Sequence, residues 1–343
     1  MNFKVTAGLI IVALIVGVVA LVNPFKEEEE IRSRSPWFYQ VSEEDIETIT
    51  VTHKGDSVTF NKVGDYTWAF QNPEGIPPDY VRWGGIPLLL SGPGTRRDLT
   101  VVQPIIEDPA QYGLDDPDTI VDVGLTAGRQ IQFRLGDQTT DGRHVYGKVI
   151  GFPDLFIIAG VWGEVISRLA FEPPLPKWAV ERTPDTIAEL NVYLGDAAEA
   201  DTPFLNFSRD FRSGEWSVRK FDVDKEKRPV DEERWKDIEP LVVGPGNISV
   251  AVPIVDDRDY SPWGIVDSSN SIEIRFSGTS DSGTRFTDGF LLRLGDKTED
   301  GKYYYAKSVS DFVRQPVLKL DAQWVETILG LFDDVPYGDK EDA

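Results

Sequence analysis

The chain begins with an apolar run, followed by short stretches in which apolar and polar residues alternate. Residues 5–22 carry no charged side chain. At a rise of about 1.5 Å per residue, a helix of this length spans about 27 Å, close to the thickness of a bilayer's hydrocarbon core. We therefore predict a transmembrane signal anchor over residues 1–22, with the rest of the chain outside the cytoplasm. A cleaved signal peptide is the competing interpretation, because Ala20 and other small residues lie near the end of the run.

Strand-like alternation begins after a polar tether. Residues 23–36 are acidic and show no apolar periodicity. From Trp37 onward, apolar residues recur with a period of two between turns rich in Gly and Asp, which is typical of antiparallel strands. We predict strands at 46–51, 58–60, 66–70, 120–125, 131–135, 144–150 and 155–158. A short, interrupted helix is expected after Pro77-Pro78-Asp79, and a second helix over 161–169.

The same order of patterns occurs twice. Residues 135–148 (LGDQTTDGRHVYGK) and 294–307 (LGDKTEDGKYYYAK) are identical at eight of fourteen positions. Tryptophans recur at similar spacings around both copies, which indicates an internal duplication. We predict homologous halves at 37–172 and 178–335, a Pro-rich linker at 173–177 and an acidic tail at 336–343. The expected fold class is α+β, with antiparallel β-meanders, short helices packed on one face of each sheet and buried tryptophans between them.

The repeated stretch is predicted to be a β-hairpin that sets the register of each half. Asp-Gly is a strong hairpin signal, because Gly adopts positive φ at little cost. The residues of this structural motif are Gly136, Gly142, Tyr146, Gly295, Gly301 and Tyr305. We expect Gly142 and Gly301 to form the turns, and Tyr146 and Tyr305 to pack inward.

The same loops are the weak candidates for a metal site. Each has the form G-D-x-T-x-D-G, which places Asp137 near Asp141 and Asp296 near Asp300. Carboxylate and hydroxyl oxygens suit Ca²⁺, but the spacing is not that of a helix–loop–helix calcium site and no bidentate Glu follows. Asp side chains that bond turn amides are the preferred interpretation. No metal or cofactor is therefore assigned.

The amino-acid composition limits the binding and catalytic functions that the chain could have. The net charge of −23 disfavours nucleic acid, because its binding depends on cations that neutralise phosphates. The chain has no cysteine and only two histidines, His53 and His144, which excludes thiol chemistry and leaves no plausible nucleophilic triad. The acidic pairs Asp115-Asp116 and Asp256-Asp257 could be imagined as glycosidase carboxylates, but adjacent side chains usually point apart. We assign no catalytic residue and expect no enzymatic activity.

One segment carries a resemblance to a known family. The segment Tyr112-Gly113-Leu114-Asp115-Asp116-Pro117 is followed by a strand pair, an LGD…G…Y hairpin and a short helix. This succession resembles the domain of unknown function 4340 family. The second half departs from it, since Ser261-Pro262-Trp263-Gly264-Ile265 replaces Tyr-Gly-Leu and no Asp-x-Pro follows. The resemblance implies a membrane-attached, extracytoplasmic protein whose gene accompanies ABC-2-type or gliding-motility-type transport systems. It supplies no catalytic residues.

The resulting expectation is a non-catalytic, single-pass protein of the cell membrane. It would act outside the cytoplasm as an auxiliary or scaffold component of an ABC-type export system, with permease or auxiliary subunits as partners. The transport part of this expectation follows from the resemblance alone. The alternative is an envelope polysaccharide-binding or -cleaving protein that uses aromatic and acidic residues. That alternative requires tryptophans and tyrosines exposed along a groove.

Overall fold

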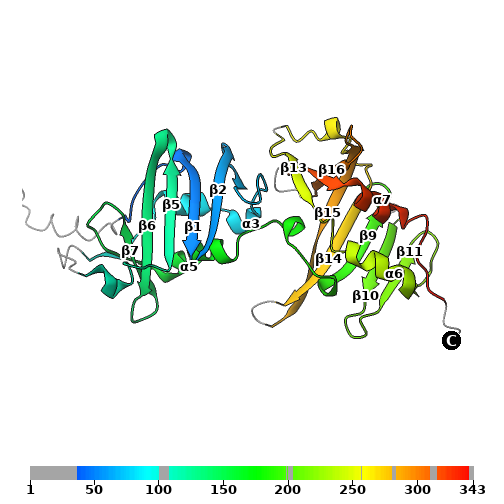
Figure 1. Cartoon of the computed structure of the whole chain (residues 1–343), viewed down its shortest axis with the longest axis horizontal. Helices are drawn as coiled ribbons and strands as arrows, with labels where there is room; N and C mark the ends of the chain where they lie inside the picture. The colour runs from blue at the N-terminus through cyan, green and yellow to red at the C-terminus, as the bar shows by residue number, and fades with distance from the viewer. Residues whose placement is uncertain are drawn as a thin grey trace, which may run out of the picture.

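The structure, a computed structural model, consists mainly of two antiparallel sheets with a few short helices (Figure 1). It describes residues 37–99, 108–197, 199, 204–255, 257–279, 283–309 and 315–339. The predicted anchor and tether lie outside these ranges. Within them, none of the helices has the length and apolar character needed to cross a bilayer.

The first sheet has eight strands in the order β3-β2-β1-β5-β6-β7-β8-β4. Their bounds are β1 Ile46–His53, β2 Asp56–Gly64, β3 Thr67–Phe70, β4 Arg97–Asp98, β5 Thr119–Leu125, β6 Arg129–Gln138, β7 His144–Val149 and β8 Phe156–Ala159. The seven predicted strands are all present, because each carries the alternation of a sheet with one buried face. Only β4, a two-residue strand at the edge of the sheet, was not predicted.

The second sheet has nine strands in the order β12-β11-β10-β9-β14-β15-β16-β17-β13. Their bounds are β9 Ile187–Tyr193, β10 Phe204–Arg209, β11 Trp216–Lys220, β12 Arg228–Pro229, β13 Ile248–Val252, β14 Ser271–Thr279, β15 Arg285–Lys297, β16 Tyr303–Ser308 and β17 Val317–Asp321. Apart from the additional edge strand β12, the order repeats that of the first sheet. In both, a central antiparallel pair, β1–β5 or β9–β14, joins two meanders.

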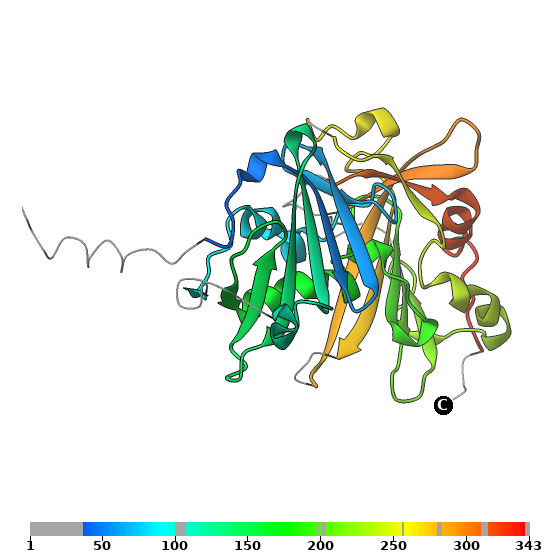
Figure 2. The same cartoon turned by 60° about the vertical axis from the view of Figure 1, so that its left-hand side comes forward.

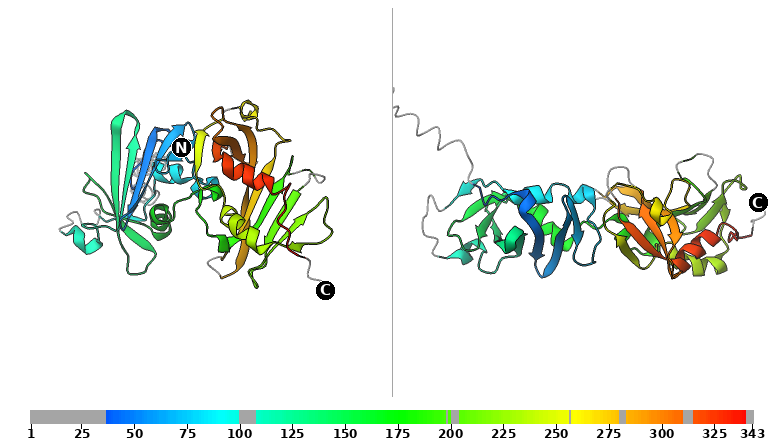
Figure 3. Two further views of the ribbon diagram at one scale, coloured as in Figure 1. Left: turned by 45° about the vertical axis from the view of Figure 1, so that its right-hand side comes forward. Right: turned by 90° about the horizontal axis from the view of Figure 1, so that it is seen from above.

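Helices cover one face of each sheet. The α-helices are α3 Tyr80–Trp83, α4 Ile86–Ser91, α5 Gly160–Phe171, α6 Glu232–Ile238 and α7 Ala322–Gly330. The 3-10 turns are η1 Glu43–Asp45, η2 Pro109–Tyr112, η3 Thr126–Gly128, η4 Lys177–Ala179, η5 Pro184–Thr186, η6 Glu239–Leu241 and η7 Ser261–Trp263. Helix α5 packs across β1, β2, β7 and β8 (Figure 2). Helices α6 and α7 lie on the same face of the second sheet (Figure 3). The α+β class is thus confirmed in its coarse form.

Most of the tryptophans lie between helices and sheets, as predicted. Six are buried: Trp68, Trp83, Trp178, Trp216, Trp235 and Trp324. In the first half Trp83 packs against Phe60, with ring centroids 4.3 Å apart, and in the second Trp235 packs against Phe207 at 4.9 Å. Trp37 departs from the prediction that the tryptophans are buried, because it is 52% exposed.

The two halves touch where apolar side chains of the second half approach glycine residues of the first. A Cβ built on Gly64, at the end of β2, would lie 2.8 Å from Cδ1 of Ile254, which follows β13. A Cβ on Gly75 would lie 3.7 Å from Cβ of Val250. Most buried apolar residues of both halves belong to one cluster. The halves therefore share an apolar contact, which is expected to limit their relative motion.

The predicted linker is also packed. The Asp79 amide donates to the Pro174 carbonyl (2.6 Å), and Arg82 donates to the Pro173 carbonyl (3.3 Å). At the other end of the linker, Lys177 donates to Asp288 of β15 (2.7 Å). The linker is held to both halves.

The first residues of the predicted acidic tail, 336–339, contact the second half. Tyr337 forms a β-bridge with Val230 at the edge of the second sheet. The Asp231 amide donates to the Pro336 carbonyl (2.9 Å), and the Arg228 guanidinium lies 4.0 Å from the centre of the Tyr337 ring. The Tyr337 ring therefore packs against the second half.

Candidate functional site

The first copy of the repeated hairpin is held by an Asp side chain within its own turn. Thr139 donates from Oγ1 to Asp141 Oδ1 (2.5 Å), and the Arg143 amide donates to the same oxygen (3.0 Å). Gly142 has φ +67° and its amide donates to the Thr139 carbonyl (2.8 Å). The turn is therefore closed by side-chain and backbone bonds together.

The second copy repeats this arrangement. Thr298 donates to Asp300 Oδ1 (2.6 Å), and the Lys302 amide donates to the same oxygen (3.1 Å). Gly301 has φ +71°, and its amide donates to the Thr298 carbonyl (2.8 Å). The prediction that Gly142 and Gly301 form the turns agrees with both geometries.

The two turn carboxylates are both easier to ionise than usual. The hydrogen bond from Thr139, and then the one from the Arg143 amide, lower the pKa of Asp141. The bonds from Thr298 and Lys302 do the same for Asp300. Hydrogen bonds to the charged form favour that form. Both groups are exposed anions that serve the turn.

The other aspartate of each loop lies against a glycine clasp, by which we mean the contact of Gly113 with Gly136 and of Gly264 with Gly295. A Cβ built on Gly136 would lie 2.1 Å from the Tyr112 carbonyl oxygen. A Cβ on Gly113, where φ is +65°, would lie 2.4 Å from Asp137 Oδ1. Only glycine allows this approach of the two backbones.

The clasp is reproduced in the second half. A Cβ on Gly295 would lie 2.2 Å from the Trp263 carbonyl oxygen, and one on Gly264 2.3 Å from the Asp296 carboxylate. Both halves have a one-residue register shift at this point of the hairpin. Such a bulge bends the strand and leaves one residue without a partner in the backbone ladder. The LGD sequence is thus a bulge that receives the preceding Tyr-Gly or Trp-Gly turn.

These positions weaken the calcium hypothesis for Asp137, Asp141, Asp296 and Asp300. In each loop, one aspartate lies against the clasp and the other binds its own turn. Across the ranges that the structure describes, no three or more His, Asp or Glu side chains are grouped closely enough to hold a metal ion. The bonds observed favour the structural interpretation of the loops.

The prediction that Tyr146 and Tyr305 pack inward is wrong. Both are half-buried on the sheet face opposite the helices. Tyr146 packs edge-on against Tyr112, with ring centroids 4.8 Å apart, and Tyr305 packs against a small separate cluster that includes Tyr260 and Ile265. The inward positions are taken by their neighbours, such as Val145 and Ala306. The two tyrosines support the clasp from the other face.

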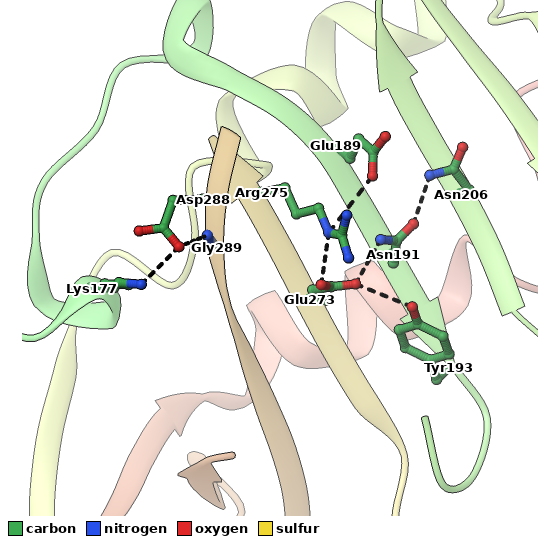
Figure 4. A network of polar contacts seen from close by, with 9 residues as sticks. All are labelled: Lys177, Glu189, Asn191, Tyr193, Asn206, Glu273, Arg275, Asp288 and Gly289. Carbon is green, nitrogen blue, oxygen red and sulfur yellow. Dashed lines mark hydrogen bonds and ion pairs between the residues drawn. The ribbon is translucent and has the colours of Figure 1, made fainter. Parts of the chain in front are cut away.

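A polar network lies on the helix-free face of the second sheet (Figure 4). Asn206 on β10 donates to Asn191 on β9 (2.7 Å), and Asn191 donates to Glu273 Oε2 on β14 (2.8 Å). Tyr193 donates to the same oxygen (3.1 Å), and Arg275 donates to Glu273 Oε1 (2.8 Å). We call these five residues the Glu273 network. It crosses three strands at the centre of the sheet.

The Glu273 network is poorly suited to proton transfer near neutral pH. Burial, together with the charge of Glu273, raises the pKa of Tyr193 to about 12. The hydrogen bond from Arg275 to Glu273 raises the already high pKa of Arg275. A general acid or base works best when its pKa is near the operating pH. We therefore interpret the network as a structural group of paired charges and hydrogen bonds on the surface of the sheet.

Sequence reasoning missed this network, although one signal for it exists. In the repeat alignment, Glu273 falls at the position of Asp122 in the first half, 151 residues earlier. Asp122 also accepts bonds from neighbouring side chains, those of Gln130 (3.1 Å) and Gln132 (2.7 Å). A carboxylate at the same place in both central strand pairs could have been found by comparing the halves.

A second polar contact in Figure 4 joins the linker to the second sheet. Lys177 donates to Asp288 Oδ1, and the Gly289 amide donates to the same oxygen (2.8 Å). Nearby, the Arg182 guanidinium lies 3.9 Å from the centre of the Phe276 ring. These contacts fix the chain where it enters the second half.

An open hollow of about 360 Å³ lies between the second hairpin and α7. It includes Lys297, which donates to Glu326 (2.6 Å), so that the pKa of Lys297 is raised and that of Glu326 is lowered. The first half has Gln138 in place of Lys297. The ion pair of Lys297 with Glu326 is therefore not repeated in the first half.

The other candidate groups of the sequence do not converge. Asp115 and Asp116 are exposed, and Asp256 lies outside the described residues. His53 Nδ1 is 2.8 Å from Thr119 Oγ1, while His144 lies in the hairpin, 3.7 Å from Asp141. Each histidine has a local polar partner in its own part of the first sheet.

The tryptophans weigh against the polysaccharide alternative. That alternative requires them exposed along a groove, whereas six are buried and Trp162 and Trp263 are partly buried. Trp37 is the exception, and it lies beside Gly92 at the end of α4. The aromatic residues mainly form the core.

Comparison with known proteins adds no family or relative. No family model matches this chain, and neither does any curated protein or any solved structure.

Proposed function

We propose that this protein is a non-catalytic, two-lobed scaffold, held at a membrane by its N-terminal apolar run. It acts outside the cytoplasm as an auxiliary subunit of an ABC-type export assembly. We also propose that the two halves arose by duplication. We further propose that the chain is a member of the domain of unknown function 4340 family.

The observation that carries the scaffold role is the joining of two lobes of the same topology. The lobes meet through Gly64, Ile254, Gly75 and Val250 and share one apolar cluster. An apolar contact of this kind favours a rigid spacer, whereas a ligand-binding pair of lobes would be expected to open a cleft with convergent polar groups. The Glu273 network satisfies its own charges, which also suits a fixed surface.

The membrane and transport parts rest on the sequence. Residues 5–22 have the length and composition of a bilayer span, and the family resemblance supplies the transporter as partner. We therefore expect the full chain to purify in mild detergent with an integral permease and its ATPase.

The test is purification of the full chain at native expression level, with the same chain lacking residues 2–22 as the control. Recovery of permease and ATPase subunits with the full chain would support the proposal. Recovery of the full chain alone, as a monomer, would contradict the transport role. Release of the full chain from membranes by high salt, without detergent, would contradict the anchor.

A further inference from the structure

The helix layer of the first half exposes an unusual number of apolar side chains. We define the apolar helix face as Trp37 (52% exposed), Val81 (89%), Leu88 (62%), Leu89 (40%), Val161 (73%) and Val165 (38%). Single exposed apolar residues are ordinary, but a contiguous group of them commonly marks an interaction surface.

Contacts between the helices show that these residues lie on neighbouring elements. Trp162 of α5 donates from Nε1 to the Leu89 carbonyl of α4 (3.4 Å). Arg82 of α3 donates to the Glu172 carbonyl at the end of α5 (2.8 Å). Helix α4 therefore meets α5 at Trp162, and α3 meets the C-terminal end of α5. At the end of α4, a Cβ on Gly92 would lie 3.3 Å from the Trp37 ring.

The corresponding layer of the second half is polar. On α7, Gln323 stands at the position of Val161 and Thr327 at that of Val165, both 162 residues later, and both are exposed. Helix α6 exposes Glu232, Glu233, Arg234, Lys236 and Asp237. The same topology is therefore built with polar residues at these outward positions.

We propose that the apolar helix face lies on the surface of the lipid bilayer. This inference rests on the membrane anchor in the proposed function. The described chain begins at Trp37, on this face, and the 14 residues of 23–36 separate it from the apolar run. Even fully extended, they span at most about 50 Å, so the anchor keeps Trp37 within that distance of the membrane.

The chemistry of the face fits the interfacial region of a bilayer. Trp37 and the exposed Tyr80 are of the types that collect at the level of the lipid headgroups, and valine and leucine side chains bury in the acyl boundary. The charged residues beside them are paired: Arg168 with Glu164 (2.9 Å) and Arg82 with Glu172 (3.2 Å). Binding therefore depends on apolar burial and needs no anionic lipid.

The test uses single cysteines, because the native chain has none. The full chain with Val161→Cys or Gln323→Cys is labelled with an environment-sensitive fluorophore and reconstituted into phosphatidylcholine vesicles that carry a nitroxide near the headgroup. These two positions correspond in the two halves. Val161 belongs to the apolar helix face, whereas Gln323 lies on the polar helix α7. We expect a blue shift and severalfold stronger quenching at Val161→Cys than at Gln323→Cys.

A second variant tests the cause of the shift. Val161→Gln with Val165→Thr gives α5 the residues of α7 at those positions, and a probe at Leu88→Cys should then lose most of its blue shift and quenching. Equal, weak quenching at Val161→Cys and Gln323→Cys in protein that floats with the vesicles would overturn the inference and leave the anchor intact. Protein that does not float would contradict both. A blue shift in detergent that grows with protein concentration would instead indicate a second copy and overturn the lipid assignment.

Discussion

The two halves share an interior and differ in their surfaces. Both have the same strand order around a central antiparallel pair, and both close their hairpin with the same Thr–Asp turn and glycine clasp. The first half adds an apolar helix face, while the second carries polar helices and the Glu273 network. Residues that fix the fold are thus the same in both halves, and outward positions differ. We therefore expect any difference in the roles of the two lobes to depend on these outward residues.

The tryptophans of α5 and α7 offer the strongest test of that comparison. Trp324 is 6% exposed and donates to the Leu241 carbonyl (2.9 Å), whereas Trp162, at the matching place, is partly buried and its bond to Leu89 is 3.4 Å. We expect Trp324→Ala to lower the free energy of unfolding by about 4 kcal/mol and Trp162→Ala by about 2 kcal/mol. Urea unfolding followed by circular dichroism measures both. Equal losses would show that the two helices pack alike.

The glycine clasp should respond alike in both halves. Gly136→Ala and Gly295→Ala each place a Cβ about 2 Å from a backbone carbonyl oxygen, which must move. We expect each variant to lose about 3 kcal/mol, the upper range for overpacking. Gly330→Ala, at the exposed end of α7 with no atom within 4 Å of the new Cβ, is the control and should be nearly neutral. A tolerated Gly136→Ala would mean that the backbones approach less closely than described.

The strands and the repeat could be predicted because they are local patterns. Alternation located the predicted strands of the first half to within a few residues, since every second side chain meets the helices. The two-residue strands β4 and β12 lack enough positions to show a period. The face of Tyr146 was also readable, because it shares alternation with His144 and Lys148. Tyr305 was harder, since Tyr303, Tyr304 and Tyr305 give no contrast between faces.

The Glu273 network could not be predicted from one stretch of sequence. Asn191 and Glu273 are 82 residues apart and meet only because β9 pairs with β14 in one register. The partners of a strand depend on the topology, which alternation does not specify. The apolar helix face had the opposite difficulty. Val161 and Val165 lie in a helical pattern, in which apolar residues are normally predicted to be buried. Only comparison with the matching helix of the second half shows that these two positions face outward.

Removing the charge of Glu273 should affect the second half more than the matching change affects the first. Glu273→Gln puts an amide where Asn191, Tyr193 and Arg275 now donate to a carboxylate, so we expect a loss of about 2 kcal/mol. Asp122→Asn faces only two amide donors, and we expect less than about 1 kcal/mol. Chemical denaturation measures the pair. A larger loss of stability for Asp122→Asn than for Glu273→Gln would contradict the view that the Glu273 network distinguishes the second half.

The smallest expected effect concerns the two turns, where the halves should behave identically. The pKa values of Asp141 and Asp300 are held below the ordinary value of 3.8, so the folded state favours both anions. Their contribution to stability is present above pH 3.8 and is lost as pH falls through the lowered pKa. Asp141→Asn and Asp300→Asn should therefore be slightly less stable than the native chain at pH 7, and this difference should close as pH falls below 3.8. Melting curves at pH 7 and at acidic pH measure it, and EDTA is added at pH 7, where it binds divalent cations. A melting temperature that falls on adding EDTA in the native chain, but not in the variants, would mean that the loops bind a cation, because hydrogen bonds within a turn do not respond to a chelator.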